Sequence, residues 1–495
     1  MPSPLVLTNT LSGKKEVFQP LNPPYVGIYQ CGPTVYGEPH LGHARPAVAF
    51  DVLRRYLEWQ GYKVRYVRNI TDVGHLEQDA DEGEDKIAKK ARVEQLEPME
   101  IAQRYTLSYQ EAMRKLGVKA PSIEPRASGH ISEQIEMIQT ILGKGLAYEV
   151  NGSVYFDIEA YRKSGEYGIL SGRIPEDQLS GTRDLEGQDE KRNPLDFALW
   201  KKAAPEHIMR WPSPWSVGFP GWHIECSAMS HKYLGRQFDI HTGGMDLLFP
   251  HHECELAQST AAGNPHPVKY WVHNNMITIN GQKMGKSLGN FINLSEFFSG
   301  SHPALTQVYS PMTIRLFMLQ AHYRSPLDFS NEALQAAAKA YRKILNARLI
   351  LQHFDASQLG AQADPTQESE VNQLCLDAFA GLDDDLNTAV CLAAVFGMIK
   401  KINALQNNQI PAASFDQPLF DKLQSQFSLL TEGILGIADE NHPELSAPLD
   451  LLMEIYREAK AAKDYGKVDQ IRARFKEMGL LIKDLKTGSY RAYEE

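Results

Sequence analysis

Two short motifs in the chain carry side chains suited to handling phosphate. The first is His40-Leu-Gly-His43, which follows a short apolar stretch and opens a segment of helical periodicity. Free backbone N–H groups and the positive end of a helix attract phosphate, and two histidines three residues apart can both face that anion. They could donate hydrogen bonds to charge that develops on a phosphoryl group during displacement. A pair of structural histidines is the alternative explanation.

The second motif is Lys283-Met-Gly-Lys286-Ser287, a glycine-bearing loop with two lysines. Flexible ammonium groups suit a departing pyrophosphate, because lysine acts as an adjustable point charge. Taken by itself, this pattern also fits a surface turn. The lysine loop and the upstream His-x-x-His helix start are more specific together than either is alone.

A third group of residues offers metal ligands. His251 and Glu255 are four residues apart, so both lie on one face of a helix and could bind one ion. Cys31 and Cys226 could complete a four-ligand site if the fold brings two strand ends together. Cys254, three residues after His251, is also a good thiolate ligand. These residue types favour zinc.

The elements that must position these residues form a recognisable pattern. Residues 25–31 are predicted to form a buried strand, residues 48–57 have helical spacing, and residues 63–70 are predicted to form a second strand. A strand, helix and strand in this order predict a right-handed βαβ unit, the start of a doubly wound parallel sheet. Such sheets bind ligands beyond the carboxyl ends of their strands, where the loop 31–43 lies.

The rest of the chain divides by composition. Between about residues 120 and 215 no clear βα alternation is visible, which indicates an insertion in the sheet. Helical patterns dominate from residue 331 onward, for example over residues 333–351. The polar stretch 358–370 is predicted to be a linker.

Length and composition exclude several classes of protein. The chain has 495 residues, enough for about three domains, and its composition is that of a globular protein. No apolar run approaches the roughly 18 residues of a membrane helix, and the first ten residues do not resemble a signal peptide. We therefore expect a cytoplasmic protein with no membrane partner. Five cysteines indicate free thiols or metal ligands rather than a disulfide framework.

The charge is unevenly distributed. The net charge of −10, taken whole, argues against a dedicated nucleic-acid binder. However, residues 351–450 hold 3 Lys and Arg against 15 Asp and Glu, whereas residues 451–495 hold 10 against 8. The last segment also contains Tyr490 and Tyr493. It predicts a modest basic and aromatic surface, suited to a single-stranded RNA loop on whose bases tyrosine could stack.

The ordered motifs resemble those of class I aminoacyl-tRNA synthetases. His40-Leu-Gly-His43 is similar to the HIGH signature, and the lysine loop is similar to KMSKS, with Gly285 in place of the usual serine. Further segments narrow the resemblance to the cysteinyl-tRNA synthetase family: Cys31-Gly-Pro-Thr-Val-Tyr36, Asn69-Ile-Thr-Asp72, Gly221-Trp-His-Ile-Glu-Cys226-Ser-Ala-Met229, Gly243-Gly-Met-Asp246, Phe249-Pro-His-His-Glu253 and Asp383-Asp-Asp-Leu-Asn-Thr388.

This resemblance implies ATP-dependent activation of L-cysteine to cysteinyl-adenylate and transfer of cysteine to the 3′ end of tRNA(Cys), by a monomer. It implies an α/β, Rossmann-like, parallel doubly wound catalytic domain with an insertion, followed by a helical bundle and a small C-terminal anticodon-binding domain. The expected segments are 1–130 and 216–275 for the two catalytic halves, 131–215 for the insertion, 276–345 for the KMSKS-like loop and stem-contact region, 346–445 for the bundle and 446–495 for the C-terminal domain.

The resemblance also implies roles for individual residues. The expected catalytic residues are His40, His43, Lys283 and Lys286. ATP, with Mg²⁺ on its phosphates, is expected at Gly42, His43, Gly244, Asp246 and Lys286. The amino acid is expected at Thr71, Asp72, Trp222 and His223, although a helix cap would explain Thr71 and Asp72 equally well and core packing would explain Trp222. One Zn²⁺ is expected on Cys31, Cys226, His251 and Glu255, with Cys254 as a neighbour.

Zinc would explain how such a protein distinguishes cysteine from serine. Pocket shape supplies only about 1–3 kcal/mol for so small a change. A thiolate is a far better zinc ligand than an alcohol, so coordination supplies discrimination that packing cannot.

Two other functions remain open at this point. A cysteine ligase of mycothiol synthesis shares the adenylating module but joins cysteine to a sugar amine, and the long segment after Arg342 argues against it. A non-catalytic zinc-binding or thiol-sensing relative could keep the same fold. The intact histidines and lysines of the two motifs argue against that reading.

Overall fold

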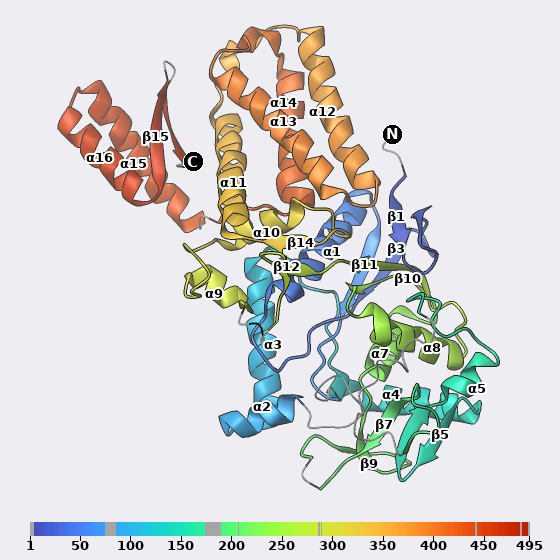
Figure 1. The fold of residues 1–495 in the computed structure, drawn as a ribbon. Helices are drawn as coiled ribbons and strands as arrows, with labels where there is room; N and C mark the ends of the chain where they lie inside the picture. The colour runs from blue at the N-terminus through green and yellow to red at the C-terminus, as the bar shows by residue number, and fades with distance from the viewer. Residues whose placement is uncertain are drawn as a thin grey trace.

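The computed structural model of the protein describes residues 4–74, 86–173, 190–205, 207–285, 288, 290–440, 443–485 and 488–493. At its centre is a four-stranded parallel sheet in the order β11-β10-β3-β4 (Figure 1). Its strands are β3 (Tyr25–Gln30), β4 (Lys63–Arg68), β10 (Phe238–Gly244) and β11 (Val268–Asn274). The parallel pairing confirms the predicted α/β class.

Helix α1 (Leu41–Trp59) connects β3 to the parallel strand β4 and confirms the predicted βαβ order. Its apolar residues at helical spacing, such as Val48 and Val52, are buried in the core. The second strand ends at Arg68, two residues earlier than expected. The reason is that the Ile70 N–H donates to the carbonyl of Pro125 instead of continuing the central sheet.

The segment between β4 and β10 forms most of the lower part of the molecule in Figure 1. It contains an antiparallel sheet in the order β5-β6-β7-β9-β8. That sheet takes in β9, beyond residue 215, so it continues past the segment expected for the insertion. The elements are α2 (Lys86–Glu94), α3 (Pro98–Lys115), α4 (Ile131–Gly143), β5 (Ala147–Val150), β6 (Ser153–Phe156), α5 (Ile158–Arg162), β7 (Phe197–Lys202), β8 (Trp211–Pro212) and β9 (Val217–Pro220).

The chain then returns to the central sheet through two helices that pack against each other, α7 (Ile224–Leu234) and α8 (Glu253–Ala261). A short irregular helical turn, Leu248–His252, precedes α8. A small second sheet, in the order β13-β12-β14, follows β11. Its strands and the neighbouring helices are β12 (Ile277–Ile279), β13 (Gln282–Lys283), α9 (Leu294–Ser299), α10 (Pro311–Leu319) and β14 (Leu327–Phe329).

Four long helices form a bundle above the central sheet in Figure 1: α11 (Asn331–His353), α12 (Pro365–Asp383), α13 (Thr388–Gln406) and α14 (Gln417–Ser428). Helix α11 confirms the helix predicted over residues 333–351. The linker predicted over residues 358–370 is only partly correct, because α12 begins at Pro365, where the Asp364 side chain caps it. The polar residues after Pro365 are largely exposed positions of that helix.

Among the described residues, one helix, α13, is long and apolar enough to cross a membrane. It packs against α11 and α12, and more than half of its apolar window is buried. Its composition is therefore explained by its place in the bundle.

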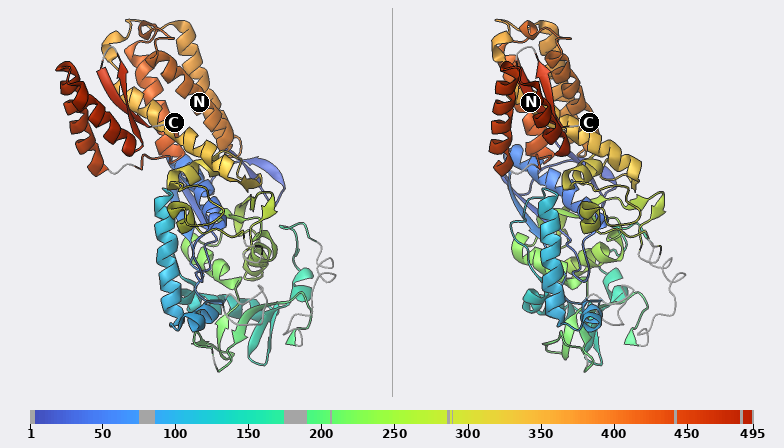
Figure 2. Two further views of the ribbon diagram at one scale, coloured as in Figure 1. Left: turned by 60° about the vertical axis from the view of Figure 1, so that its left-hand side comes forward. Right: turned by 90° about the vertical axis from the view of Figure 1, so that its left-hand side faces the viewer.

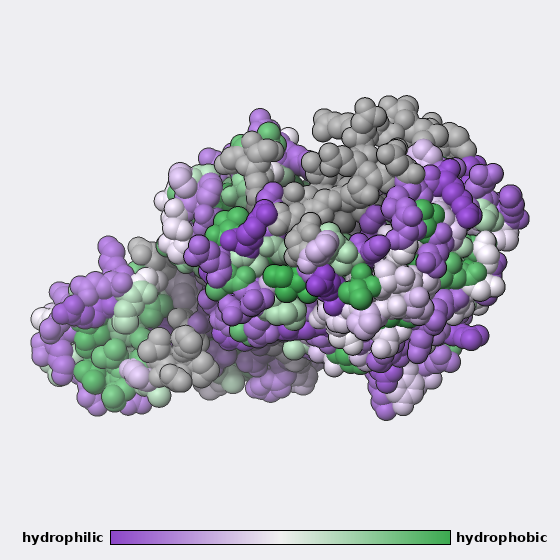
Figure 3. All heavy atoms as spheres, turned by 90° about the horizontal axis from the view of Figure 1, so that it is seen from below, coloured by the Kyte–Doolittle hydropathy of each residue, from purple (hydrophilic) through white to green (hydrophobic). Residues whose placement is uncertain are grey.

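The C-terminal segment forms a small domain of two helices and a hairpin. These are α15 (Pro443–Ala461), α16 (Tyr465–Glu477) and the antiparallel strands β15 (Leu480–Leu485) and β16 (Gly488–Tyr493). The views in Figures 1 and 2 place this domain beside the bundle, at the end of the molecule opposite the antiparallel sheet. Seen from below in Figure 3, it is a separate lobe at the left.

The buried apolar side chains also set the C-terminal domain apart from the rest of the molecule. One continuous apolar cluster joins the central sheet, α1, α3 and α10 to the bundle. The C-terminal domain has a small cluster of its own, which includes Met453, Tyr456 and Phe475. The bundle and the central sheet therefore share a core, whereas the C-terminal domain attaches through its surface.

Candidate functional site

A cavity of about 490 Å³ opens at the carboxyl end of the central sheet. The register of the parallel strands aligns Gln30 with Thr242 and with Arg68, so the residues that follow these strands meet at one edge. The predicted site residues that line the cavity are Cys31, His40, Gly42, His43, Thr71, Trp222, Cys226, Gly244, Asp246, His251 and Lys283. Lys286 lies outside the described residues.

The two histidines at the start of α1 accept main-chain hydrogen bonds there, and these bonds decide which ring nitrogen carries the proton. The Nδ1 atom of His40 accepts a hydrogen bond from the Gly42 N–H at 3.1 Å, and Nδ1 of His43 accepts one from the His40 N–H at 3.4 Å. Their rings stack, with centroids 3.8 Å apart. Because each Nδ1 is an acceptor, each neutral ring carries its proton on Nε2, where it can serve as a donor.

At two glycine positions near this edge, a side chain would crowd a neighbouring residue. A Cβ atom on Gly42 would lie 2.9 Å from Cε1 of His40, so a side chain there would disturb the cap of α1. A Cβ atom on Gly244 would lie 2.2 Å from Oδ1 of Asp246. The bare backbone at Gly244 therefore lets the Asp246 carboxylate fold back over the end of β10, where it lines the cavity.

The lysine loop is fastened by a residue for which the sequence had suggested no role. The Asn290 side chain accepts a hydrogen bond from the Gly285 N–H at 2.9 Å and donates one to the Lys283 carbonyl at 3.0 Å. Lys283 is exposed at the end of β13 and lines the cavity. Asn290 thus compensates in part for the backbone freedom that Gly285 adds to the loop.

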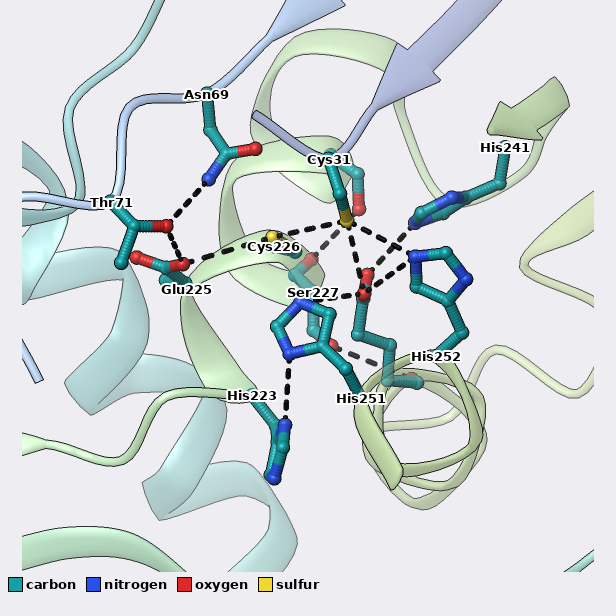
Figure 4. Close-up of polar contacts among 12 residues, drawn as sticks. Cys31, Asn69, Thr71, His223, Glu225, Cys226, Ser227, His241, His251 and His252 are labelled. Carbon is teal, nitrogen blue, oxygen red and sulfur yellow. Dashed lines mark hydrogen bonds and ion pairs between the residues drawn. The ribbon is translucent and has the colours of Figure 1, made fainter. Parts of the chain in front are cut away.

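The four predicted metal ligands are buried and lie together. Cys31, Cys226 and His251, labelled in Figure 4, also line the cavity. Sγ of Cys31 is 3.7 Å from Sγ of Cys226 and 3.5 Å from Oε1 of Glu255. The same Oε1 is 3.2 Å from Nε2 of His251. In a tetrahedral zinc site with ordinary bond lengths, the corresponding separations are about 3.8, 3.5 and 3.3 Å. These three separations match the edges of a zinc-sized tetrahedron, and all four donor atoms lie within 4.8 Å of one another.

A second group of potential ligands overlaps the first and consists of Cys31, His241, His252 and Glu255. It fits an ion less well, because Nε2 of His241 is only 2.9 Å from Oε2 of Glu255, which is a hydrogen-bond distance. Neither His241 nor His252 lines the cavity. The first group is therefore the one with access to a substrate.

These additional histidines form a hydrogen-bonded shell around the ligands that sequence analysis did not find. His241 contacts the second oxygen of Glu255, and Nε2 of His252 lies 3.3 Å from Sγ of Cys31. Behind them, Nδ1 of His252 is 2.7 Å from Nε2 of His273. Such partners fix the orientation and the tautomer of metal ligands. The only signal in the sequence is the number of histidines near β10 and β11, which does not reveal their pairing.

Burial sets the protonation of this region. It raises the pKa of the Cys31 thiol well above its usual range and that of Cys226 to about 12. Burial also lowers the pKa of His252 well below its usual range and that of His273 to about 3. The imidazoles of His252 and His273 are therefore neutral, and the two thiols lose their protons when a cation binds between them.

The structure places two predicted amino-acid-binding residues away from the cavity. Both oxygens of Asp72 are engaged by Ser128, whose N–H and Oγ donate at 2.8 and 2.7 Å. Asp72 thus holds the short helix Ala127–His130, which agrees with its alternative role as a cap. His223 lies behind His251, and their Nδ1 atoms are 2.9 Å apart (Figure 4). It orients a predicted metal ligand instead of lining the cavity.

Thr71 and Cys254 have distinct surroundings. Thr71 lines the cavity and donates its hydroxyl to the buried carboxylate of Glu225, which the sequence did not single out. Cys254 packs away from the ligand cluster, with Sγ 3.5 Å from the hydroxyl of Tyr167. It belongs to neither group of potential ligands.

Comparison with known proteins identifies the class of this fold and site. The family model described as "tRNA synthetases class I (C) catalytic domain" matches residues 17–339, and the model of the DALR domain matches residues 380–438. The chain therefore has the catalytic domain of a class I tRNA synthetase. Among solved structures, methionyl-tRNA synthetase of Mycobacterium tuberculosis in complex with methionyl-adenylate has the same fold, with a TM-score of 0.59 at 14% identity over 87% of this chain and 94% of that chain.

Curated relatives narrow the class further. The cysteine–tRNA ligases of Cytophaga hutchinsonii and Porphyromonas gingivalis are 59% and 56% identical to this chain, over 99% of each protein. That of Thermus thermophilus is 47% identical over 98% of each. The chain belongs to the cysteine–tRNA ligase family.

Proposed function

We propose that this protein joins L-cysteine to the 3′ end of tRNA(Cys) in two steps, with cysteinyl-adenylate as the intermediate. The observation that carries the proposal is the meeting of three groups at one cavity. These are the cluster of four potential zinc ligands, the histidine-capped start of α1 and the lysine loop. Membership of the cysteine–tRNA ligase family supports the same reaction.

Cys31, Cys226, His251 and Glu255 would hold one Zn²⁺, whose chemistry when bound is to take a sulfur ligand in preference to a hydroxyl. The residues around the cluster do the remaining work of selection. His223 and His241 fix the predicted ligands His251 and Glu255 from behind, so the donor atoms are arranged before substrate arrives. Trp222, whose ring lies 4.5 Å from that of His251, closes one side of the amino-acid position.

The first step is adenylation, in which the cysteine carboxylate attacks the α-phosphate of ATP and pyrophosphate leaves. His40 and His43 donate from Nε2 to the charge that develops on the phosphoryl oxygens. Lys283 and Lys286 neutralise the departing pyrophosphate, and Mg²⁺ accompanies the ATP phosphates. Asp246 accepts hydrogen bonds from the ribose hydroxyls, and Gly42 and Gly244 allow close approach of the nucleotide.

The second step moves cysteine to the terminal ribose of tRNA(Cys). We assign contact with the anticodon end of the tRNA to the C-terminal domain. Its place at the end of the molecule remote from the antiparallel sheet supports this assignment (Figure 1). We further propose that the protein acts as a cytoplasmic monomer. No side chain is assigned as a general base for either step.

The test is a two-stage assay with the purified, metal-analysed protein. We expect about one zinc per chain, pyrophosphate exchange that depends on cysteine, and charging of tRNA(Cys), with serine rejected in both stages. A cysteine ligase that uses a sugar amine would pass only the exchange stage, and a thiol sensor would pass neither. A metal-free protein that still rejects serine would contradict the role given to zinc.

A further inference from the structure

The C-terminal domain meets the rest of the molecule through its last strand. In Figures 1 and 2 the hairpin of β15 and β16 lies between the bundle and the helices α15 and α16, which face away. Strand β16 contacts helix α11 of the bundle. Because the two parts have separate apolar cores, this contact decides how the domain is oriented.

The contact has a specific hydrogen-bonded centre. Asn346, buried in the middle of α11, accepts a hydrogen bond from the Tyr493 N–H at 2.7 Å and donates one to the Tyr493 carbonyl at 3.1 Å. One side chain thus satisfies both main-chain groups of a single residue, as a neighbouring strand would. The Tyr493 hydroxyl also lies 3.0 Å from the carboxylate of Asp439, in the segment that leads out of the bundle.

The side chains beside this centre are held against the bundle. Tyr490 and Tyr493 are partly buried and pack against the core shared by the bundle and the central sheet. The sequence had suggested that these two tyrosines stack on RNA bases, but their surroundings in the structure are those of an interface. Helix α16, on the side away from the bundle, carries exposed cations at Arg472, Arg474 and Lys476.

We propose that Asn346 and Tyr493, with Asp439, form an interdomain latch that holds the C-terminal domain in the orientation required for tRNA. The proposal rests on the function proposed above and concerns how the partner is positioned. A tRNA that contacts both the C-terminal domain and the cavity is a bivalent ligand. Its second contact is favourable only if the two sites are held at the matching distance and orientation.

The physical effect of the latch is preorganisation. When the domain is already oriented, tRNA binding does not include the entropic cost of ordering it. Asn346 is suited to this task, because an amide supplies one donor and one acceptor at a fixed separation. Its two hydrogen bonds to Tyr493 involve no residue that lines the catalytic cavity. We therefore expect the loss of Asn346 to weaken tRNA binding and to leave cysteine activation unchanged.

The test compares the full-length chain with Asn346→Ala, with a chain lacking residues 493–495, and with both changes combined. We expect KM for tRNA to rise about 10-fold in Asn346→Ala, because the two hydrogen bonds to Tyr493 are lost and the domain is freed. The rise should be at least as large in the shortened chain, which also loses the contact of Tyr493 with Asp439. The combined variant should be no worse than the shortened chain alone, since both changes break the same pair of hydrogen bonds. KM for cysteine and the rate of pyrophosphate exchange should remain unchanged.

The matched control is Asn372→Ala on α12. Its side-chain oxygen accepts a hydrogen bond from the exposed Lys422, within the bundle, and the change should leave KM for tRNA unchanged. An unchanged or lowered KM for tRNA in Asn346→Ala would overturn the latch, as would fully additive effects in the combined variant. If the unmodified protein failed to charge tRNA at all, the proposed function itself would be wrong.

Discussion

Cys226 and Cys254 are both fully buried thiols, yet their positions predict opposite consequences of mutation. Cys226→Ser should lower the zinc content from about one per chain to nearly none and raise KM for cysteine at least about 100-fold, because loss of a ligand costs more than loss of an outer-shell partner. Cys254→Ser is the matched control and should keep its zinc, since Sγ of Cys254 faces Tyr167. Metal analysis that gave the reverse pattern would contradict the ligand assignment.

The second prediction at the level of residues concerns Lys283. Lys283→Ala should lower kcat for pyrophosphate exchange by about 10²–10³-fold, because its charge is needed chiefly as pyrophosphate departs. KM for cysteine should change less than about twofold, since the ligand cluster is distinct from the lysine loop. Steady-state exchange kinetics measure both quantities, and an equal loss of cysteine binding and of rate would argue for a structural role.

At the scale of elements, the middle of α1 is held by a buried ion pair. Arg315 of α10 donates to Asp51 of α1 at 2.6 Å, and its other nitrogens donate to the carbonyls of Leu435 and Leu116. One guanidinium thereby joins α1, α10, the end of the bundle and the end of α3. Burial by itself would raise the pKa of Asp51, but Arg315 and Arg55 outweigh it and hold the pKa below its usual value.

This arrangement predicts a pH-dependent loss of stability in Asp51→Asn. At neutral pH the variant should be less stable by about 3–5 kcal/mol, because Arg315 keeps a buried charge without its partner. The pKa of Asp51 is lower in the folded state, so its contribution is complete above the unfolded value of about 4 and is lost as the pH falls through the folded value.

Denaturant unfolding of both proteins between pH 7 and pH 3 measures this difference. The gap between the unmodified chain and Asp51→Asn should shrink toward the acid end of the range. The exposed substitution Asp377→Asn on α12 serves as the control and should show no such gap. A constant gap at every pH would show that Asp51 contributes by packing and not by its charge.

At the scale of the whole molecule, the catalytic cavity and the proposed tRNA-binding domain belong to parts with separate apolar cores. The central sheet and the bundle share one apolar cluster, so the cavity and the bundle form one body. The C-terminal domain has its own small core and is attached at β16, by the hydrogen bonds between Asn346 and Tyr493 and by the packing of Tyr490 and Tyr493. A change in the attachment of the C-terminal domain can therefore alter tRNA binding without altering the cavity. For this reason the latch variants should raise KM for tRNA and leave KM for cysteine unchanged.

The sequence by itself determined the class of protein and most of the candidate site. Local patterns suffice for this: the apolar period of residues 48–57 predicts a helix, and a four-residue spacing places His251 and Glu255 on one face. The motif order then identified the cysteine-specific family. These features depend on residues that are near one another in the chain, or on motifs that can be matched one at a time.

Only the tertiary structure decided which residues meet across long separations. It showed that Cys226 and not Cys254 joins Cys31, that Asp72 caps a helix, and that His241, His252 and His273 support the ligands. It also turned Tyr493 from a suggested base-stacking residue into part of an interface. The physical reason is that hydrogen-bond partners distant in sequence are selected by packing, and spacing along the chain carries no record of that packing.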